Sequence, residues 1–260
     1  MFLQKSLAMR FFLGYNERQA MLSAKNEFPR RGMEIAENRK EFHMITLERT
    51  SVMNLENAIR GARNPMNSWG RMDSGYNENG EYVLGPNDLD LAKRLRKAGT
   101  GDHRKYLRQV FVSVDITAPM YWWKEYDTYK VATVANSTST MHKIHSRPFE
   151  LDDFSHDHMT PETLEYMKTV VEQLEKIRLK YMETKEKAYW YDMIQLLPSS
   201  YNQMRTCTMN YENLINMYYA RRSHKLQEWH TFCDWIKTLP YAKELILAEE
   251  DRIPERSDPI

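Results

Sequence analysis

The sequence predicts an α+β fold in which a small, mostly antiparallel sheet carries several long helices. One observation is the run RQVFVSVDI at residues 108–116, where apolar side chains alternate with other residues as in a strand with one buried face. A second is Thr160-Pro161, a hydroxyl cap followed by proline, which is typical of a helix start. Apolar residues then recur every three or four positions, as on the inner face of a long helix. They are Leu164, Met167, Val171, Leu174, Ile177 and Tyr181.

The composition is that of a folded globular protein with no strong charge bias. The chain has 260 residues, of which 42% are hydrophobic and 28% charged. A net charge of +1, from 37 bases and 36 acids, disfavours a nucleic-acid polymer as partner. No apolar run approaches the roughly 18 residues of a membrane span, so we expect no membrane partner. The start, MFLQKSLAMRFFLGY, is interrupted by Arg10 and favours an amphipathic extension over a signal peptide.

Cysteine usage and missing motifs exclude several common chemistries. Cys207 and Cys233 form no CxxC pair, which suits a reducing compartment, and we therefore expect a cytoplasmic protein without a cysteine zinc site. The sequence contains no GxGxxG, GxxxxGK[ST], HExxH or GxSxG motif. Any nucleotide must therefore be bound without one of these common phosphate-binding loops.

The first part of the chain alternates helices, strands and a long loop. Residues 17–44 look helical and charged, with breaks at Pro29 and Gly32, and 45–52 (ITLERTSV) look like a strand. We expect a short helix over 54–63, capped by Asn54. Residues 64–86 are rich in turn-forming types and predict a loop with a hairpin around NENGEYV.

Three further helices are expected. One runs from Asn87, as its cap, to Ala98, with Leu91, Leu95 and Ala98 on one face and Gly99 closing it. A second follows Pro119, where the central strand ends. The third covers roughly 211–237 and carries a set of apolar residues. They are Leu214, Ile215, Tyr218, Leu226, Trp229 and Trp235.

Histidines and aspartates gather between residues 142 and 158. Imidazole and carboxylate are common metal ligands, so a metal site is one interpretation. The spacings fit no standard site, and we favour a polar loop without a metal. The residues are His142, His145, Asp152, Asp153, His156, Asp157 and His158.

Two other clusters suggest polar binding surfaces. We expect Asn210, Asn216 and Arg221 to share one face of the 211–237 helix, where two amides and a guanidinium would suit a heterocycle or a phosphate. A solvated helix face is the alternative. The segment VATVANSTST (131–140) offers hydroxyl and amide donors from Thr133, Asn136 and Thr138. A loop with local side-chain-to-backbone bonds is the alternative there.

The run HRKYLRQVFVSVDITAPMYWWKEYDTYKVATVANSTSTM (103–141) resembles the central segment of flavin-dependent thymidylate synthases, the thymidylate-synthase-complementing-protein family. In that family a histidine-containing turn leads into a strand ending in Arg-Ala-Pro. A helix then carries Arg-His-Arg-x-x-Ser-x-Asn-Glu-x-Ser-x-Arg. Thr117-Ala118-Pro119 matches the strand end, and Thr128-Tyr129-Lys130 matches Arg-His-Arg. Thr133, Asn136, Thr138 and Thr140 fall on the first serine, the glutamate, the second serine and the last arginine.

A second segment, LLPSSYNQMRTCTMNYENLINMYYARRSHKLQEW, resembles the late part of the same family. Pro198, Asn210, Asn216, Arg221 and Gln227 keep its order and spacing. The similarity covers roughly residues 45–240. Several family arginines are replaced, including one that is Ile194 here, and Lys130 alone keeps a positive charge in the first triplet.

The resemblance implies a fold, a reaction and an assembly. We expect a helical extension over 1–44, the family domain over 45–245 and a disordered tail over 246–260. The implied enzyme is a homotetramer that binds FAD in a groove between subunits and methylates deoxyuridine monophosphate or a related deoxypyrimidine nucleotide. Methylenetetrahydrofolate and NADPH are the implied co-substrates.

The resemblance also assigns roles to residues. His103, Lys130, Asn210 and Asn216 would contact FAD. Arg221 would be catalytic, facing the pyrimidine and stabilising its anionic form. The other substrate-binding residues would be Thr133, Asn136, Thr138 and Gln227. Arg63, Arg205 or Arg222 could replace the missing phosphate-binding arginines. The alternative function is a non-catalytic nucleotide-binding or assembly protein that keeps the same oligomeric fold.

Overall fold

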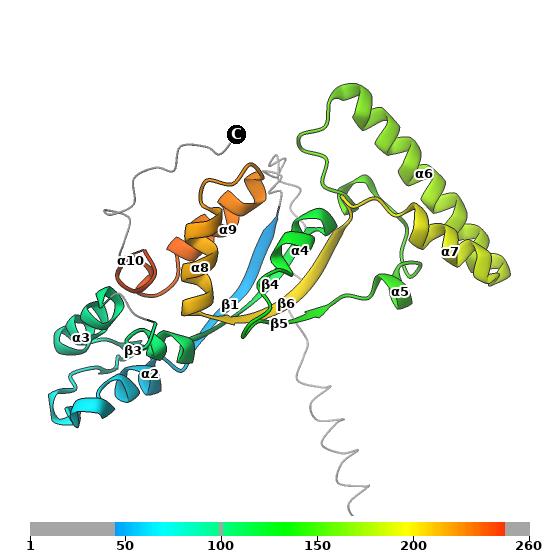
Figure 1. The fold of residues 1–260 in the computed structure, drawn as a ribbon. Helices are drawn as coiled ribbons and strands as arrows, with labels where there is room; N and C mark the ends of the chain where they lie inside the picture. The colour runs from blue at the N-terminus through cyan, green and yellow to red at the C-terminus, as the bar shows by residue number, and fades with distance from the viewer. Residues whose placement is uncertain (1–44, 99–100, 248–260) are drawn as a thin grey trace, which may run out of the picture. The chain divides into compact units, whose positions relative to one another are not determined.

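A computed structural model describes residues 45–98 and 101–247 of the chain. The main sheet has the order β1-β4-β6-β5, and every neighbouring pair is antiparallel (Figure 1). Its strands are β1 (Thr46–Met53), β4 (Phe111–Pro119), β5 (Val134–Ser137) and β6 (Asn202–Asn210). A separate hairpin pairs β2 (Gly75–Tyr76) with β3 (Tyr82–Val83). The predicted α+β class, the small antiparallel sheet and the hairpin around NENGEYV are confirmed.

Helices account for much of the remaining described chain. They are α2 (Leu55–Ala62), α3 (Pro86–Lys97), α4 (Met120–Tyr126), α5 (Thr140–Lys143), α6 (Pro161–Thr184), α7 (Lys187–Leu196), α8 (Tyr211–Arg221), α9 (Gln227–Lys237) and α10 (Ala242–Leu245). Short 3-10 helices are η1 (Asn64–Met66), η2 (Trp69–Arg71), η3 (Lys105–Gln109) and η4 (Leu151–Asp153). The helix expected within 17–44 and most of the predicted tail lie outside the described residues.

One face of the main sheet forms the larger core. Val112, Val114 and Ile116 are at most 1% exposed, as their alternation predicts. They share this core with residues of α4, α8 and α9. At its centre Trp122 packs against Trp229, with the ring centroids 4.7 Å apart. The tryptophan pair of α4 is therefore core.

The other face of the sheet is polar. Thr206 donates to Asp115 across the β4–β6 pair at 2.6 Å, and Thr208 lies 3.2 Å from the Ser113 hydroxyl. These cross-strand pairs stabilise the sheet on a face without an apolar core.

The helices α6 and α7 form a smaller, second core. The Thr160 hydroxyl accepts from the Thr163 N–H, which confirms the predicted start of α6. The predicted inner face is also confirmed, because Met167, Val171, Leu174 and Ile177 are buried. These residues pack against α7 and the preceding loop. The two helices lie side by side in Figure 1.

The prediction of a single long helix over 211–237 is wrong. The structure has two helices, α8 and α9, separated by residues 222–226. The His224 ring accepts from the Leu226 N–H at 3.1 Å, and Leu226 is extended. A straight helix of this length would reach about 40 Å. The break lets Trp229 join the same core as α8.

The cap predicted for α3 is also wrong, and the apolar face picked from the sequence is not the most buried one. The helix begins at Pro86, and the loop residue Asp73 accepts from the N–H groups of Asn87 and Asp88. Its buried residues are Asp88, Ala92 and Arg96, whereas Leu91 and Leu95 are half-buried and Ala98 is exposed. Arg96 donates to the carbonyls of Leu245 and Ile246 at 2.9 and 3.1 Å. Asn54, likewise, makes no side-chain cap of α2 and donates to the Gln109 carbonyl instead.

A buried ion pair joins α2 and α3. Asp88 is 0% exposed and accepts from Arg63 Nε at 2.6 Å and from the Ser74 hydroxyl at 2.5 Å. Burial raises the pKa of Asp88, but the hydrogen bonds from Ser74 and Arg63 outweigh it and hold that pKa below its usual range. Arg63 is therefore committed to a structural pair.

We predict that Asp88→Ala lowers the free energy of unfolding by about 3–5 kcal/mol at neutral pH, because Arg63 stays buried without a counter-charge. Urea denaturation measures the loss. The double variant Asp88→Leu/Arg63→Met removes both charges and should recover part of it. Because the folded-state pKa of Asp88 is lowered, its contribution is present above the unfolded pKa of about 3.9 and disappears as pH falls through the folded value. Wild-type stability in the Asp88→Ala variant would contradict this.

Candidate functional site

The two segments that carry the family resemblance meet within one chain. Strand β5 pairs with β6 in the register Val134↔Thr208 to Ser137↔Arg205. One turn into α8, the Asn213 amide donates to the Val131 carbonyl at 2.9 Å. Residues 129–137 therefore lie along β6 and α8, and we call this region the α8 corner.

The segment 128–140 is not a helix, although the family carries the matching signature on one. The helix α4 ends at Tyr126, and Val134–Ser137 form an edge strand. All four strand residues are exposed. Small and β-branched residues suit this position, because β6 offers a free edge and no core lies outside it.

Arg221 is held by a carboxylate that the sequence did not single out. Its Nη1 donates to Glu125 Oε2 at 2.5 Å, and its Nε donates to the Tyr129 hydroxyl at 2.8 Å. The guanidinium also lies over the Trp229 ring, 4.7 Å from its centroid. The Glu125 oxygen accepts from Trp229 Nε1 at 3.1 Å and lies 3.2 Å from His224 Nε2. Arg221 is thus a paired, half-buried cation, 17% exposed.

Asn210, Asn216 and Arg221 do not form one polar surface, although Asn210 and Arg221 fall within about 20° of each other around α8 at 3.6 residues per turn. Asn210 is buried and caps α8, accepting from the Asn213 N–H at 2.9 Å in a reciprocal capping box. Arg221 lies at the other end of α8, about 16 Å away along the axis. Asn216 is exposed and about 140° from Arg221 around the helix at 3.6 residues per turn. The expected three-residue face is therefore wrong.

The remaining predicted residues lie on several elements. His103 is exposed in the turn before η3, and its neighbour Arg104 pairs with Glu212 of α8 at 3.2 Å. Lys130 and Thr133 line a cavity of about 310 Å³ together with Tyr126, Asp127, Tyr129 and Ala135. Gln227 is exposed at the start of α9.

The hydroxyls of the 131–140 segment mostly bond to the backbone. Thr133 donates to the Tyr129 carbonyl, and Thr138 donates to the Met204 carbonyl at 3.2 Å. Ser139 accepts from the His142 N–H at 3.0 Å. The bonds of Thr133 and Ser139 are the local pattern expected as the alternative to a binding surface, whereas the bond of Thr138 reaches across to β6. Asn136 is exposed on β5.

The buried thiols are poor nucleophiles. Burial raises the pKa of Cys207 to about 11 and the pKa of Cys233 to about 12. Because the thiolate is the reactive form, neither is prepared for covalent catalysis at neutral pH. Burial also raises the pKa of Tyr126, beside Cys207, well above its usual range.

The α8 corner suits the ring of a flavin better than its phosphates. Tyr126, Tyr129 and Ala135 give the 310 Å³ cavity flat or small walls. Of the nearby cations, Arg221 is paired with Glu125, and Arg205 is paired with Asp127 at 2.8 Å. Lys130 is exposed. A pyrophosphate prefers several cationic partners, so the described residues of one chain fit the ring and leave the phosphates undersupplied.

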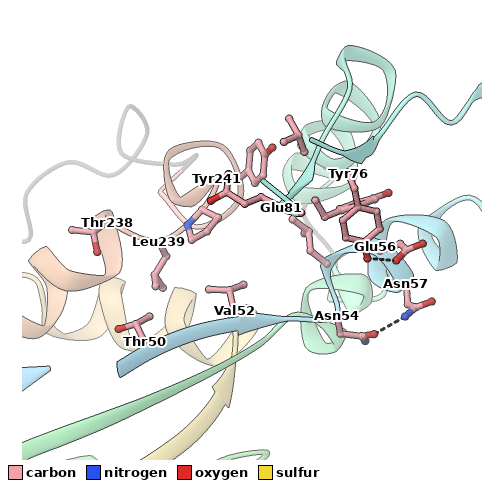
Figure 2. Close-up of a pocket in the computed structure, with 15 residues that line it drawn as sticks. Thr50, Val52, Asn54, Glu56, Asn57, Tyr76, Glu81, Thr238, Leu239 and Tyr241 are labelled. Carbon is pink, nitrogen blue, oxygen red and sulfur yellow. Dashed lines mark hydrogen bonds between the residues drawn. The ribbon is translucent and has the colours of Figure 1, made fainter. Parts of the chain in front are cut away.

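A second cleft, of about 910 Å³, opens between β1, α2, the β2–β3 hairpin and the α9–α10 turn (Figure 2). Figure 2 shows the Tyr76 hydroxyl bonded to Glu56, at 2.7 Å, and Asn57 bonded to Asn54. Glu56 and Glu81 line it, and no Lys, Arg or His does. Its charge therefore disfavours a phosphate-bearing ligand.

The histidine–aspartate region forms no metal cluster. In residues 45–98 and 101–247 no three His, Cys, Asp or Glu side chains are placed to hold a metal ion. Asp153 pairs instead with Arg147, and the His156 ring bonds to the Phe154 carbonyl. The same residues include no helix long and apolar enough to cross a membrane.

We predict that Glu125→Ala lowers the free energy of unfolding by about 1.5–3 kcal/mol, because the Arg221 guanidinium, the His224 ring and the Trp229 indole lose their shared acceptor. Urea denaturation followed by tryptophan fluorescence measures the change. Glu125→Gln keeps an acceptor oxygen and should lose less. The adjacent, exposed Lys124→Ala is the matched control and should stay within about 0.5 kcal/mol of wild type. Equal effects of Glu125→Ala and Lys124→Ala would contradict the role given to Glu125.

Sequence reasoning missed Glu125, Tyr129 as a hydrogen-bond partner, and His224. A weak signal existed, because Glu125 interrupts an aromatic run, WWKEY, in which the tryptophans predict burial. A carboxylate there needs a cation. The partner, 96 residues away, could not be read from the chain.

Comparison with known proteins identifies the fold. The sequence matches no protein-family model and no curated protein. Two solved structures of thymidylate synthase X (ThyX) from Helicobacter pylori, both with FAD and dUMP, are similar to this chain at 17% sequence identity. One has a TM-score of 0.59 and covers 80% of this chain and 97% of its own. The other has a TM-score of 0.56 and covers 82% and 100%. The described chain therefore has the α+β fold of the flavin-dependent thymidylate synthases.

Proposed function

We propose that this protein is a flavin-dependent thymidylate-synthase-like enzyme that methylates deoxyuridine monophosphate or a related deoxypyrimidine nucleotide. The observation that carries the proposal is the shared fold, which spans 97% of a ThyX chain solved with FAD and dUMP. It is supported by the meeting of residues 129–137 with α8, the two segments that carry the motif resemblance. We propose the family domain at 45–245 and a cytoplasmic location on the sequence grounds given above.

In this proposal the α8 corner holds the ligands. FAD, when bound, supplies the hydride chemistry, with NADPH as hydride source and methylenetetrahydrofolate as carbon source. His103, Lys130, Asn210 and Asn216 are the proposed cofactor contacts. Because Asn210 Oδ1 caps α8, the contribution of Asn210 would come from its amide nitrogen.

The nucleotide contacts are proposed on the same corner. They are Thr133, Asn136, Thr138, Gln227 and Arg221. Arg221 Nη2 makes no hydrogen bond with the described residues, so this donor is available to a pyrimidine carbonyl while Glu125 and Tyr129 orient the guanidinium. A donor fixed in this way stabilises developing negative charge without reorganising.

We propose that a second copy of the chain completes the site, in a homotetramer. The reason is electrostatic: one chain leaves the phosphates undersupplied with cations at the α8 corner. Cations from a neighbouring copy would supply them.

The alternative is a non-catalytic nucleotide-binding or assembly protein of the same fold. One observation favours it: the arginine at the proposed catalytic position is neutralised by Glu125. A guanidinium committed to a structural pair contributes less to transition-state charge.

Flavin uptake separates the two functions. The purified full-length chain, incubated with FAD and then desalted, should retain the visible absorption bands of oxidised flavin. It should then convert dUMP to dTMP when methylenetetrahydrofolate and NADPH are added. A chain that takes up no FAD supports the non-catalytic alternative. Growth rescue of a thymidine-requiring host tests the substrate, and failure there with flavin bound indicates another pyrimidine.

We predict that Arg221→Ala lowers dTMP formation at saturating FAD by at least about 10²-fold, the usual cost of removing one donor to developing charge. Lys225→Ala is the matched control, because Lys225 is an exposed cation four residues further along the chain. Lys225→Ala should retain activity. Activity that survives Arg221→Ala would remove Arg221 from the reaction.

A further inference from the structure

A third cavity, of about 380 Å³, lies where α5 meets the turn between α6 and α7. Its lining residues are Met141, His142, His145, Tyr181, Lys185, Lys187 and Trp190. None of them lines the cavity at the α8 corner. We call it the hairpin cavity.

The walls of the hairpin cavity are tied together by side chains. Trp190 Nε1 of α7 donates to the Met141 carbonyl of α5 at 3.0 Å. Arg178 of α6 donates to the His145 carbonyl, and Glu175 holds Arg178 at 2.6–2.7 Å. Figure 1 shows α5 next to α7. Met141 of α5 and His145, two residues past its end, are thus bonded to the α6–α7 hairpin, and the cavity is largely pre-formed.

The lining carries cations and no acid. The Lys185 ammonium lies 5.5 Å from the Tyr181 ring centroid, and the Lys187 ammonium lies 5.3 Å from the Tyr191 centroid. Neither forms an ion pair among the described residues. His145 Nδ1 is buried and has no hydrogen-bond partner in the described part of the chain. Such a group favours a ligand that completes its hydrogen bond.

Other cavities of the described chain are lined by an excess of acids or by equal numbers of acids and bases. The 910 Å³ cleft has Glu56 and Glu81 and no base. A 220 Å³ cavity beside the start of β6 has three aspartates to one arginine. At the α8 corner Lys130 is accompanied by Asp127. Among these four cavities, the hairpin cavity is therefore the one lined by bases without an acid, where an anion would be bound.

The cavity also offers a flat ring. Trp190 is half-buried and oriented by its bond to Met141, so its position is fixed before any ligand arrives. Aromatic side chains stack on every nucleobase with little base preference, and lysines bind phosphate as point charges. A volume of about 380 Å³ lies within the usual range for small-ligand sites.

We propose that the hairpin cavity binds a nucleoside monophosphate, with the phosphate at Lys185 and Lys187 and the base against Trp190. The site is separate from the proposed thymidylate-synthase site and does not depend on it. Because stacking reads the base weakly, purine and pyrimidine nucleotides should both bind. A polymer is disfavoured, since exposed Glu183 and Glu186 flank Lys185 and interrupt the basic surface.

Adenosine monophosphate, titrated with saturating FAD present, is the diagnostic probe, because the proposed thymidylate-synthase site takes a pyrimidine as its nucleotide and its flavin groove is then occupied. Isothermal titration calorimetry of the full-length chain should detect its binding, and the affinity should fall with added salt. Lys185→Gln/Lys187→Gln should weaken binding at least about tenfold, because two cationic phosphate contacts are lost. Adenosine and inorganic phosphate, each lacking one half of the ligand, should each bind more weakly than the nucleotide.

Lys180→Gln is the matched control. Lys180 belongs to the same hairpin and lies 5.6 Å from the Tyr189 centroid, but it does not line the cavity. The Lys180→Gln variant should bind adenosine monophosphate as tightly as wild type. Arg221→Ala should do so as well, which separates this site from the α8 corner. Trp190→Leu should weaken the nucleotide more than inorganic phosphate, with circular dichroism confirming the fold. Any of four outcomes would overturn the proposal. They are no binding of adenosine monophosphate to wild type, an equal loss of its binding in Lys180→Gln, binding of inorganic phosphate as tight as that of the nucleotide, and tighter binding of oligothymidylate.

Discussion

The pairing of β4 with β6 is the constraint on which the rest of the structure depends. Its unbroken antiparallel register runs from Phe111↔Asn210 to Pro119↔Asn202. This register puts Val112, Val114 and Ile116 on the covered face together with Cys207 and Met209. A shift of one residue would expose all of them. The same register determines that β6 ends at Asn210, where α8 begins, and which residues of β6 can pair with β5.

Around this apolar layer, charges organise the packing. Asp88 accepts hydrogen bonds from Arg63 and Ser74, and Arg96 donates to the Leu245 carbonyl at the end of α10. Glu125 accepts from Arg221 and Trp229 and contacts the His224 ring. In each case a buried or half-buried charge is satisfied by groups far away in sequence. These contacts position helices relative to one another. They also determine which cations are free for ligands and which are structural.

This division of charge shapes both proposals. The α8 corner lies in the part of the fold shared with the family and has flat walls and one oriented guanidinium. Its arginines Arg205 and Arg221, however, form ion pairs with carboxylates. The hairpin cavity has unpaired lysines, a buried imidazole nitrogen and a tryptophan, but it lacks the motif residues. Ring binding and phosphate binding are thus favoured at different places in one chain. Since Coulomb attraction is strongest where no counter-charge competes, the positions of carboxylates decide this as much as the positions of lysines.

The sequence by itself determined the fold class, the buried face of the central strand, the start and inner face of α6, and the hairpin, because each follows from local periodicity or local turn chemistry. The resemblance carried by two separated segments also indicated the fold that the comparisons support. Tertiary structure decided the rest. The break between α8 and α9, the rotated face of α3 and the edge strand at Val134–Ser137 depend on what the surrounding chain offers as a partner. Whether Arg221 is free or paired depends on Glu125, and no local pattern encodes a contact between residues 96 positions apart.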